Sequence, residues 1–336
     1  MKRLQIENNE FEGNNSFYLL EGDDETALVD TGVSTPDVKE QFDDNLKECG
    51  VGVGDVDHVF LTHWHADHVG LAGYVQEESG ASVHVHEADA PLVEQDEAAR
   101  DAMEEQQRSA LDDWGMPEAK KEVLLSFITS TSGILGTPPE VERFEDGDRW
   151  EVAGVELEAV HSPGHTAGLT CFAVKDDDKD DYEVFTGDAL LPVYTPNVGG
   201  ADVRVDEPLE RYVETLFRIA DRDFDRAYPG HREPIEEPTE RAVEIIEHHR
   251  ERSEKVAGVL RDEGACNAWE MGAHLFGELE SIHILHGPGE SYAHLEHMER
   301  HGVISSYRDD EDGTVRYELE DADALDDCIP STDGYV

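Results

Sequence analysis

The segment 61–70, Leu-Thr-His-Trp-His-Ala-Asp-His-Val-Gly, constrains this chain more than any other part of it. Three imidazoles and one carboxylate fall within the six residues from His63 to His68. The apolar run 57–62 before them predicts a buried strand, and residues 69–75 predict the start of a helix. Four possible metal ligands therefore stand on a strand-to-helix loop, and functional residues are common on loops held by rigid elements.

The spacing inside this loop predicts two metal sites. His63 and His65 lie two residues apart, so both rings can face one cation in an extended segment. Asp67 and His68 then turn toward a second cation. Zinc binds imidazole nitrogen and carboxylate oxygen, and a catalytic zinc keeps one position open for water. Because the loop alone supplies too few ligands, we expect others elsewhere in the chain.

Three later motifs offer the missing ligands. They are Pro-Gly-His ending at His165, Gly-Asp ending at Asp188 and Pro-Gly-His ending at His231. Each motif follows an apolar, strand-like run, and we expect the three runs to deliver these side chains to one sheet edge beside the first cluster. The runs cover residues 155–161, 182–186 and 224–228.

The order of these motifs resembles the metallo-β-lactamase superfamily, and Thr-Ala-Leu-Val-Asp-Thr-Gly at 26–32 also matches that family's first motif. The resemblance implies an α/β fold, a four-layer αββα sandwich. It also implies two Zn²⁺ ions per chain, which would share a bridging hydroxide. The implied ligands are His63, His65 and His165 for the first metal, Asp67, His68 and His231 for the second, and Asp188 as the bridge.

Further residues are candidates for supporting roles. Asp30 is expected to accept an N–H from a ligand imidazole rather than to bind metal. Asp67 and Asp188 are expected to act in catalysis as well as ligation. Tyr194 could donate to a developing oxyanion, or it could be a packing tyrosine. Arg232 places a guanidinium after His231, where it could bind a substrate carboxylate or phosphate, or pair with a surface acid. Trp64 is expected to pack beneath the ligand loop, and His84 and His86 are interpreted as packed or solvated.

This ligand set favours a zinc-dependent hydrolase of a small ester, thioester or lactone, similar to the glyoxalase-II-like branch. The alternatives are an endoribonuclease or phosphodiesterase of the same fold, a mononuclear iron dioxygenase, and a regulator with a purely structural metal. RNA-cleaving relatives often carry a long inserted domain between motifs equivalent to Asp188 and His231, which this chain lacks. The histidine at position 65 disfavours di-iron electron transfer, because those relatives have a carboxylate there.

Two domains are expected: a catalytic domain over 1–238, and a long helix with a winged-helix-like domain over 239–336. A helical insertion at 87–136 carries apolar residues at helical spacing, and it is either a lid over the substrate or a packing or dimer surface. Asp-Gly-Asp at 146–148 is expected to turn a hairpin. Helices are predicted at about 239–262, 267–279 and 291–302, before a hairpin around Asp312.

The charge balance argues against nucleic-acid partners. Asp and Glu number 80 against 26 Lys and Arg, and the formal net charge is -54. In residues 239–336 acids outnumber bases roughly threefold, whereas phosphate contact normally draws on Lys and Arg. We therefore expect a structural or dimer-forming tail, with His248, His249, His283 and His286 solvated or capping. The composition is typical of proteins from salt-loving archaea, whose salt screens self-repulsion.

The remaining features predict a cytoplasmic protein that acts on a small molecule. The N-terminus lacks the apolar core of a signal peptide, and no run approaches the length of a membrane span. Short acidic runs at 175–181 and 309–312 are the segments that fit disorder. A homodimer is possible, whereas membrane contact is not expected. The cysteines form no metal-binding pair and are interpreted as reduced thiols: Cys49, Cys171, Cys266 and Cys328.

Overall fold

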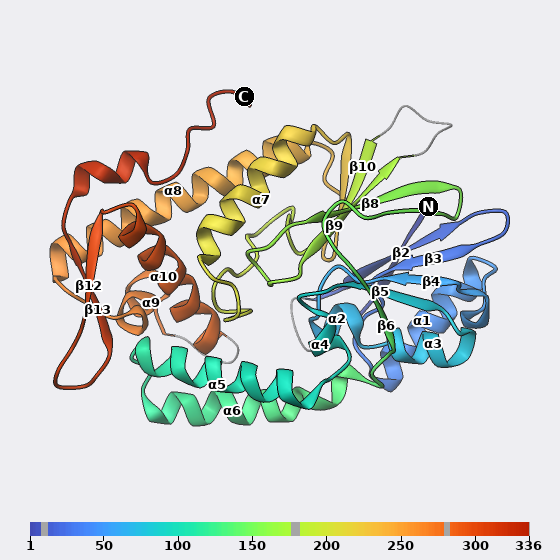
Figure 1. Ribbon diagram of the computed structural model, residues 1–336, viewed down its shortest axis with the longest axis horizontal. Coiled ribbons are helices and arrows are strands. Elements are labelled where there is room, and N and C mark those ends of the chain that lie inside the picture. Colours follow the sequence, from blue (N-terminus) through green and yellow to red (C-terminus); the bar gives the residue numbers. More distant parts are fainter. Residues whose placement is uncertain (8–12, 176–181, 279–282, 336) are drawn as a thin grey trace.

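A computed structural model describes residues 1–7, 13–175, 182–278 and 283–335. Its N-terminal part is built from two β-sheets packed face to face, with helices on both outer sides (Figure 1). The predicted four-layer α/β sandwich is therefore confirmed. Most of the acidic run at 175–181 lies outside the described residues.

The first sheet contains six strands in the order in which they follow along the chain. Strands β1 to β3 pair antiparallel, and β3 to β6 pair parallel. The strands are β1 Lys2–Ile6, β2 Asn15–Glu21, β3 Thr26–Val29, β4 His58–Phe60, β5 Ser82–His86 and β6 Val141–Phe144. Helices α1 Pro36–Glu48, α2 Ala66–Val69 and α3 Ala72–Ser79 cover its outer face, with a 3₁₀ turn η1 at Val53–Asp55. The Thr35 hydroxyl caps α1 by accepting from the Val38 N–H.

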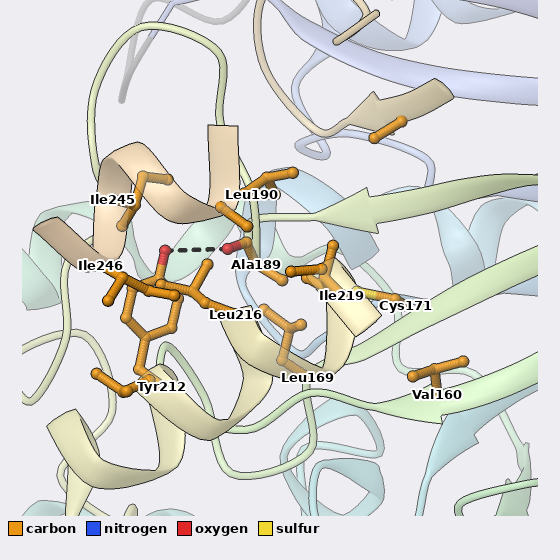
Figure 2. Close-up of a cluster of buried hydrophobic side chains, with 14 of the residues drawn as sticks. Val160, Leu169, Cys171, Ala189, Leu190, Tyr212, Leu216, Ile219, Ile245 and Ile246 are labelled. Atoms are coloured by element: carbon orange, nitrogen blue, oxygen red, sulfur yellow. Dashed lines mark hydrogen bonds between the residues drawn. The ribbon is translucent and has the colours of Figure 1, made fainter. Parts of the chain in front are cut away.

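The second sheet has the order β11-β10-β9-β8-β7, in which only the β10–β11 pair is parallel. Its strands are β7 Arg149–Val152, β8 Val155–His161, β9 Thr170–Lys175, β10 Tyr182–Gly187 and β11 Arg226–Pro229. Helix α7 (Pro208–Arg222) and the first half of α8 (Pro238–Glu263) cover its outer face. Figure 2 shows Leu216 and Ile219 of α7 packing with Ile245 and Ile246 of α8.

The space between the two sheets is filled largely by aromatic side chains. Phe60 from the first sheet meets Phe172 from the second, with ring centroids 5.6 Å apart in an edge-to-face arrangement. Such pairs add about 0.5–1.5 kcal/mol beyond area burial. The predicted hairpin at 146–148 was wrong, because this segment joins β6 of one sheet to β7 of the other. The hairpin turn lies at Ala153 and Gly154, both with positive φ.

The helical insertion packs against the C-terminal tail. The insertion contains α4 Ala90–Val93, α5 Glu97–Asp113, α6 Glu118–Thr131 and a 3₁₀ turn η2 at Ser132–Leu135. Leu111 and Trp114 share one buried cluster with Leu260 and Met271 of the tail. This shared core favours the packing interpretation of the insertion over a lid. Apolar side chains at Leu125, Phe127 and Ile128 lie outside the described residues.

The tail follows the predicted order of helices and hairpin. After α8 come α9 Ala268–Phe276, α10 His283–Arg300, β12 Ile304–Arg308, β13 Val315–Leu319 and a 3₁₀ turn η3 at Ala322–Asp327. Helix α10 begins earlier than predicted and continues through Pro288. The expectation that His249 is solvated was wrong. It is fully buried because α8 packs against both α7 and α10, and its Nδ1 lies 3.2 Å from His294 Nε2. The side chain of His283 lies outside the described residues.

Candidate metal centre

The seven predicted metal ligands lie together at one edge of the sandwich. His63 to His68 occupy the loop after β4 and the first turn of α2. His165, Asp188 and His231 follow β8, β10 and β11. His65 is half-buried and the other six are buried. The apolar strands thus carry seven polar side chains from four separate motifs into one largely buried site.

Three imidazole nitrogens converge in the first ligand group. His63 Nε2 lies 3.0 Å from His65 Nδ1, and His165 Nε2 lies 3.1 Å from the same atom. Burial, with the neighbouring imidazoles, lowers the pKa of His63 well below its usual value and that of His65 to about 4. Both rings are therefore neutral near pH 7, which is the form that binds a metal.

The second ligand group combines a carboxylate with two imidazoles. Asp67 Oδ2 lies 3.3 Å from His231 Nε2 and 3.8 Å from His68 Nε2. Burial opposes ionisation of Asp67, but the charges of His68 and His231 outweigh it and hold the pKa of Asp67 well below its usual range. Asp67 is therefore a carboxylate that can act as a ligand.

Asp188 lies between the two groups. Its Oδ1 is 3.5 Å from His68 Nε2, and its Oδ2 is 3.6 Å from His231 Nε2 and 3.7 Å from His165 Nε2. Among the described residues, neither His68 Nε2 nor Asp188 Oδ1 has a hydrogen-bond partner, although both atoms are buried. Buried polar atoms are rarely left unbonded. This pair of atoms therefore fits a site that a cation occupies.

The charge balance of the site also fits bound metal. Asp30, Asp67 and Asp188 are all buried. Burial would lower the pKa values of His68 and His231, but Asp188 and Asp67 outweigh it and raise both. Asp30 adds to the rise at His68. The carboxylates therefore favour positive charge at this position, which protons on the two rings can supply. Divalent cations would take over that role and leave both rings neutral.

Glycine is required in the last Pro-Gly-His motif. A Cβ on Gly230 would lie 2.5 Å from His68 Cε1 and 2.8 Å from Asp188 Oδ1. The backbone of this motif therefore passes against two candidate ligands at a distance that no larger residue allows.

A layer of hydrogen-bond partners orients the ligands. Asp30 Oδ2 lies 2.8 Å from His68 Nδ1, as predicted for Asp30. The sequence analysis missed Asn15, whose Nδ2 donates to Asp67 Oδ2 at 3.1 Å, and Asn197, whose carbonyl lies 2.8 Å from His165 Nδ1. Such partners fix which ring nitrogen faces the metal. No motif marks either asparagine, so only the fold reveals them.

An ion group of Asp89, Arg204 and Asp202, which we call the loop clamp, joins the loops that carry His63, His65 and His165. Asp89 and Asp202 are fully buried, and Arg204 donates to both. The two carboxylates accept from Trp64 N–H (3.2 Å), Trp64 Nε1 (3.3 Å), Thr166 Oγ1 (3.0 Å), Ala167 N–H (3.0 Å) and Gly168 N–H (3.0 Å). The sequence analysis also missed this clamp. It fixes the separation of the two loops.

Hydrogen bonds of Asn197 connect the C-terminal tail to the metal centre. The Asn197 side chain donates to Glu290 Oε2 at 3.2 Å and to the His286 carbonyl at 3.0 Å, both on α10. Glu290 is buried and pairs with Arg252 of α8. The backbone carbonyl that faces His165 is therefore anchored to the tail.

Three of the remaining predicted residues are Tyr194, Arg232 and His84. Tyr194 is half-buried on the loop after Asp188, and the Arg232 guanidinium lies 5.8 Å from its ring centroid. Arg232 itself is exposed. His84 stacks on Phe60 in the first sheet, which agrees with its interpretation as a packed residue.

The paired sheets and the clustered imidazoles and carboxylates define the class of this protein, a metal-dependent hydrolase with a metallo-β-lactamase fold. A family model described as "Metallo-beta-lactamase superfamily" matches residues 11–231. The chain therefore belongs to this superfamily. Among the described residues, no helix is long and apolar enough to cross a membrane.

Three known proteins illustrate the likeness. The metallo-beta-lactamase family protein TTHA1429 from Thermus thermophilus is 30% identical, with a TM-score of 0.79 over 95% of this chain and 98% of that one. The "Probable metallo-hydrolase YqjP" of Bacillus subtilis is 28% identical over 302 residues, 86% of this chain and 89% of that protein. The "Atrochrysone carboxyl ACP thioesterase" of Emericella nidulans is 24% identical over 65% of this chain and 51% of its own length.

Proposed function

We propose that this chain is a zinc-dependent hydrolase that uses two Zn²⁺ ions to cleave a small thioester, ester or lactone. The observation that supports it most is the position of Asp188, which faces one imidazole group with Oδ2 and the other with both oxygens. Two zinc ions in such a site would polarise a carbonyl and supply hydroxide near neutral pH.

The seven candidate ligands share two metal sites in this proposal. Asp188 contributes to both sites, and the remaining ligands divide into the two groups described above. The first group is His63, His65 and His165, and the second is Asp67, His68 and His231. The loop clamp binds Trp64 and Thr166, the chain neighbours of the three first-group histidines, and so fixes the loops that carry them. In the second group, Asp30 and Asn15 orient His68 and Asp67.

One relative and two side chains near the end of the ligand motifs suggest which substrates this chain cleaves. A named thioesterase among the relatives supports a thioester, in keeping with a glyoxalase-II-like activity. Arg232 is an exposed cation directly after His231, and we propose that it binds a carboxylate or phosphate on the substrate. Tyr194, beneath that guanidinium, is the proposed donor to the developing oxyanion.

The test compares four kinds of substrate with one preparation of the full chain. We expect zinc-dependent turnover of a small thioester, ester or lactone, and none of single-stranded RNA. Asp188→Asn should lower this turnover by at least a hundredfold, whereas Asp101→Asn, at an exposed position on α5, should leave it unchanged. RNA cleavage without ester turnover would replace this function with an endoribonuclease. Oxygen consumption with iron bound would replace it with a dioxygenase.

We also propose that residues 239–336 form a winged-helix-like structural domain that does not bind nucleic acid. The cations beside the supposed recognition helix and wing are already paired with carboxylates: Arg300 with Glu207, Arg308 with Asp113, and Arg316 with Glu270, Asp309 and Asp312. Titrations with duplex DNA and single-stranded RNA at moderate salt should show no binding. Binding whose strength falls steeply with salt would contradict this assignment.

A further inference from the structure

Two histidines and a glutamate meet between α7 and α10, away from the metal centre. His297 lies in the last turn of α10 and His301 directly follows its last residue, Arg300. The His301 N–H donates to the His297 carbonyl, so both rings lie on one face of this helical turn. Glu210 lies opposite them on α7. Its Oε2 is 2.9 Å from His297 Nε2 and 3.2 Å from His301 Nε2. One carboxylate oxygen and two imidazole nitrogens therefore converge.

One of these three side chains is buried and fixed, and the other two are accessible to solvent. The His297 side chain is 1% exposed, so its ring has little freedom to lose on binding an ion. The side chains of His301 and Glu210 are 34% and 31% exposed. A hydrated cation can therefore reach the group from the surface and keep water in its remaining coordination positions.

The observed separations of 2.9 and 3.2 Å are hydrogen-bond lengths, and a bound ion would move the ligand atoms apart by a few tenths of an ångström. Zinc–nitrogen and zinc–oxygen bonds are about 2.0–2.2 Å, which puts neighbouring ligand atoms of a tetrahedral site at about 3.3–3.6 Å from one another. The two histidines can also donate N–H bonds to Glu210 with no metal present. A hydrogen-bonded triad is thus the competing interpretation.

The surrounding charge favours a cation. Glu207, Glu296 and Glu299 lie close to the group, together with two basic residues, Arg300 and Arg211, of which Arg211 pairs with Glu207 and Glu214. Arg300 is already paired with Glu207 at 2.6 Å. Two imidazoles with one carboxylate suit Zn²⁺, Co²⁺, Ni²⁺ or Cu²⁺, whereas Mg²⁺ and Ca²⁺ prefer an all-oxygen site.

We propose that Glu210, His297 and His301 form a further metal site, which binds one divalent transition-metal ion such as Zn²⁺ and links the tail to the catalytic sheets. Helix α7 also carries Tyr212, whose hydroxyl donates to the carbonyl of Ala189, the residue after Asp188 (Figure 2). An ion between α7 and α10 therefore braces the helix that lies behind the catalytic loops. Its role is structural, because among the described residues these three ligands form a group separate from the seven residues of the metal centre.

The experiment uses Zn²⁺ as the probe and the full chain throughout. Protein stripped with a chelator is equilibrated with micromolar Zn²⁺, and bound zinc per chain is counted by elemental analysis. His301→Ala removes a partly exposed ligand, and His274→Ala removes an exposed histidine of α9 as the matched control. We expect His301→Ala to bind one zinc fewer than the parent chain and His274→Ala to bind the same number.

The thermal midpoint of unfolding provides a second, independent measurement. Added Zn²⁺ should raise the thermal midpoint of the parent chain more than that of His301→Ala, and the difference should vanish with chelator. Glu210→Gln, which keeps an oxygen acceptor, should also lose the zinc. Equal zinc content in all variants, or an equal zinc-induced shift, would establish the hydrogen-bonded triad instead. Because each count is a difference between variants, the result does not depend on how many ions the catalytic centre binds or on whether it hydrolyses anything.

Discussion

His68 Nδ1 lies 2.8 Å from Asp30 Oδ2, and both side chains are buried. Asp30 is itself fixed by the N–H of Thr62, which donates to Oδ1 at 2.8 Å, and by the Thr62 hydroxyl. The carboxylate therefore holds a proton on Nδ1, so that Nε2 faces Asp67 and Asp188 with its lone pair when a metal is bound. A partner of this kind fixes both the tautomer and the ring orientation.

Asp30→Asn tests this arrangement. The Thr62 N–H would keep the amide oxygen, so the amide NH₂ would face His68 and drive its proton to Nε2. We expect zinc affinity to fall about 10–100-fold and turnover to fall with it. The affinity is measured by competition with a chelating dye, and the thermal midpoint of the metal-free variant controls for misfolding. Unchanged zinc affinity in a folded variant would show that Asp30 does not orient His68.

Arg204→Met tests the loop clamp. Asp89 and Asp202 are fully buried, and removal of their shared guanidinium leaves buried charge uncompensated. We expect a loss of about 3–5 kcal/mol in the free energy of unfolding. Arg211→Met is the matched control, because the Arg211 side chain is 47% exposed and pairs only at the surface, where a loss of about 0–1 kcal/mol is expected. Similar losses in both variants, measured by denaturant unfolding, would contradict a special role for the clamp.

The raised pKa of Glu296 leads us to expect that the free energy of unfolding depends on pH. Burial raises the pKa of Glu296 to about 7; Glu207, Glu299 and Glu210 add to the effect, and Arg300 opposes it. The folded chain therefore binds this proton more tightly than the unfolded chain does. The contribution is fully present below the ordinary pKa of 4.5 and is lost as the pH rises through 7.

Glu296→Gln should therefore stabilise the chain by about 1–2 kcal/mol at pH 8 and have little effect near pH 4.5. The partial exposure of the side chain, 19%, reduces the effect below the full linkage value. Thermal unfolding is followed in chelator, so that no ion beside Glu210 alters the local charge. Glu254→Gln, at an exposed position of α8, serves as the control. A stabilisation that is equal at both pH values would disprove the raised pKa.

The net charge of -54 predicts a strong dependence of stability on salt. Like charges repel in the compact state, and the screening length falls from about 10 Å at 0.1 M salt to about 3 Å at 1 M. We expect the thermal midpoint to rise by several degrees between low salt and molar potassium chloride. A midpoint that stays flat or falls across this series would mean that the acidic surface serves another purpose.

The sequence indicated that the candidate ligand loops would meet, because each loop is a local motif. Each candidate ligand follows an apolar strand within a few residues, and strands that share a sheet edge bring their ends together. The clamp of Asp89 with Arg204 could not be predicted, because the two lie 115 residues apart and neither belongs to a motif. The contact between Asn197 and α10 was missed for the same reason. The hairpin error at 146–148 arose because a turn composition does not reveal which sheet the next strand joins.

The tail shows a second limit of sequence reasoning. Leu111 of the insertion and Met271 of the tail share one core, although each segment has a helical pattern that could equally cover a substrate or a partner. Amphipathic periodicity shows that a face is buried, but it does not show what buries it. His249 was misjudged in the same way, since only the packing of α8 between α7 and α10 makes its position interior.

Zinc titration of catalysis tests the central claim most directly. Metal-free His301→Ala protein, in which only the catalytic centre should bind zinc tightly, is titrated with Zn²⁺ while hydrolysis of a small thioester is followed. A binuclear hydrolase predicts that turnover rises to a plateau at two equivalents of zinc per chain, and that Asp188→Asn in the same background stays inactive. A plateau at one equivalent, or no hydrolysis of any thioester, ester or lactone with two zinc ions bound, would contradict it.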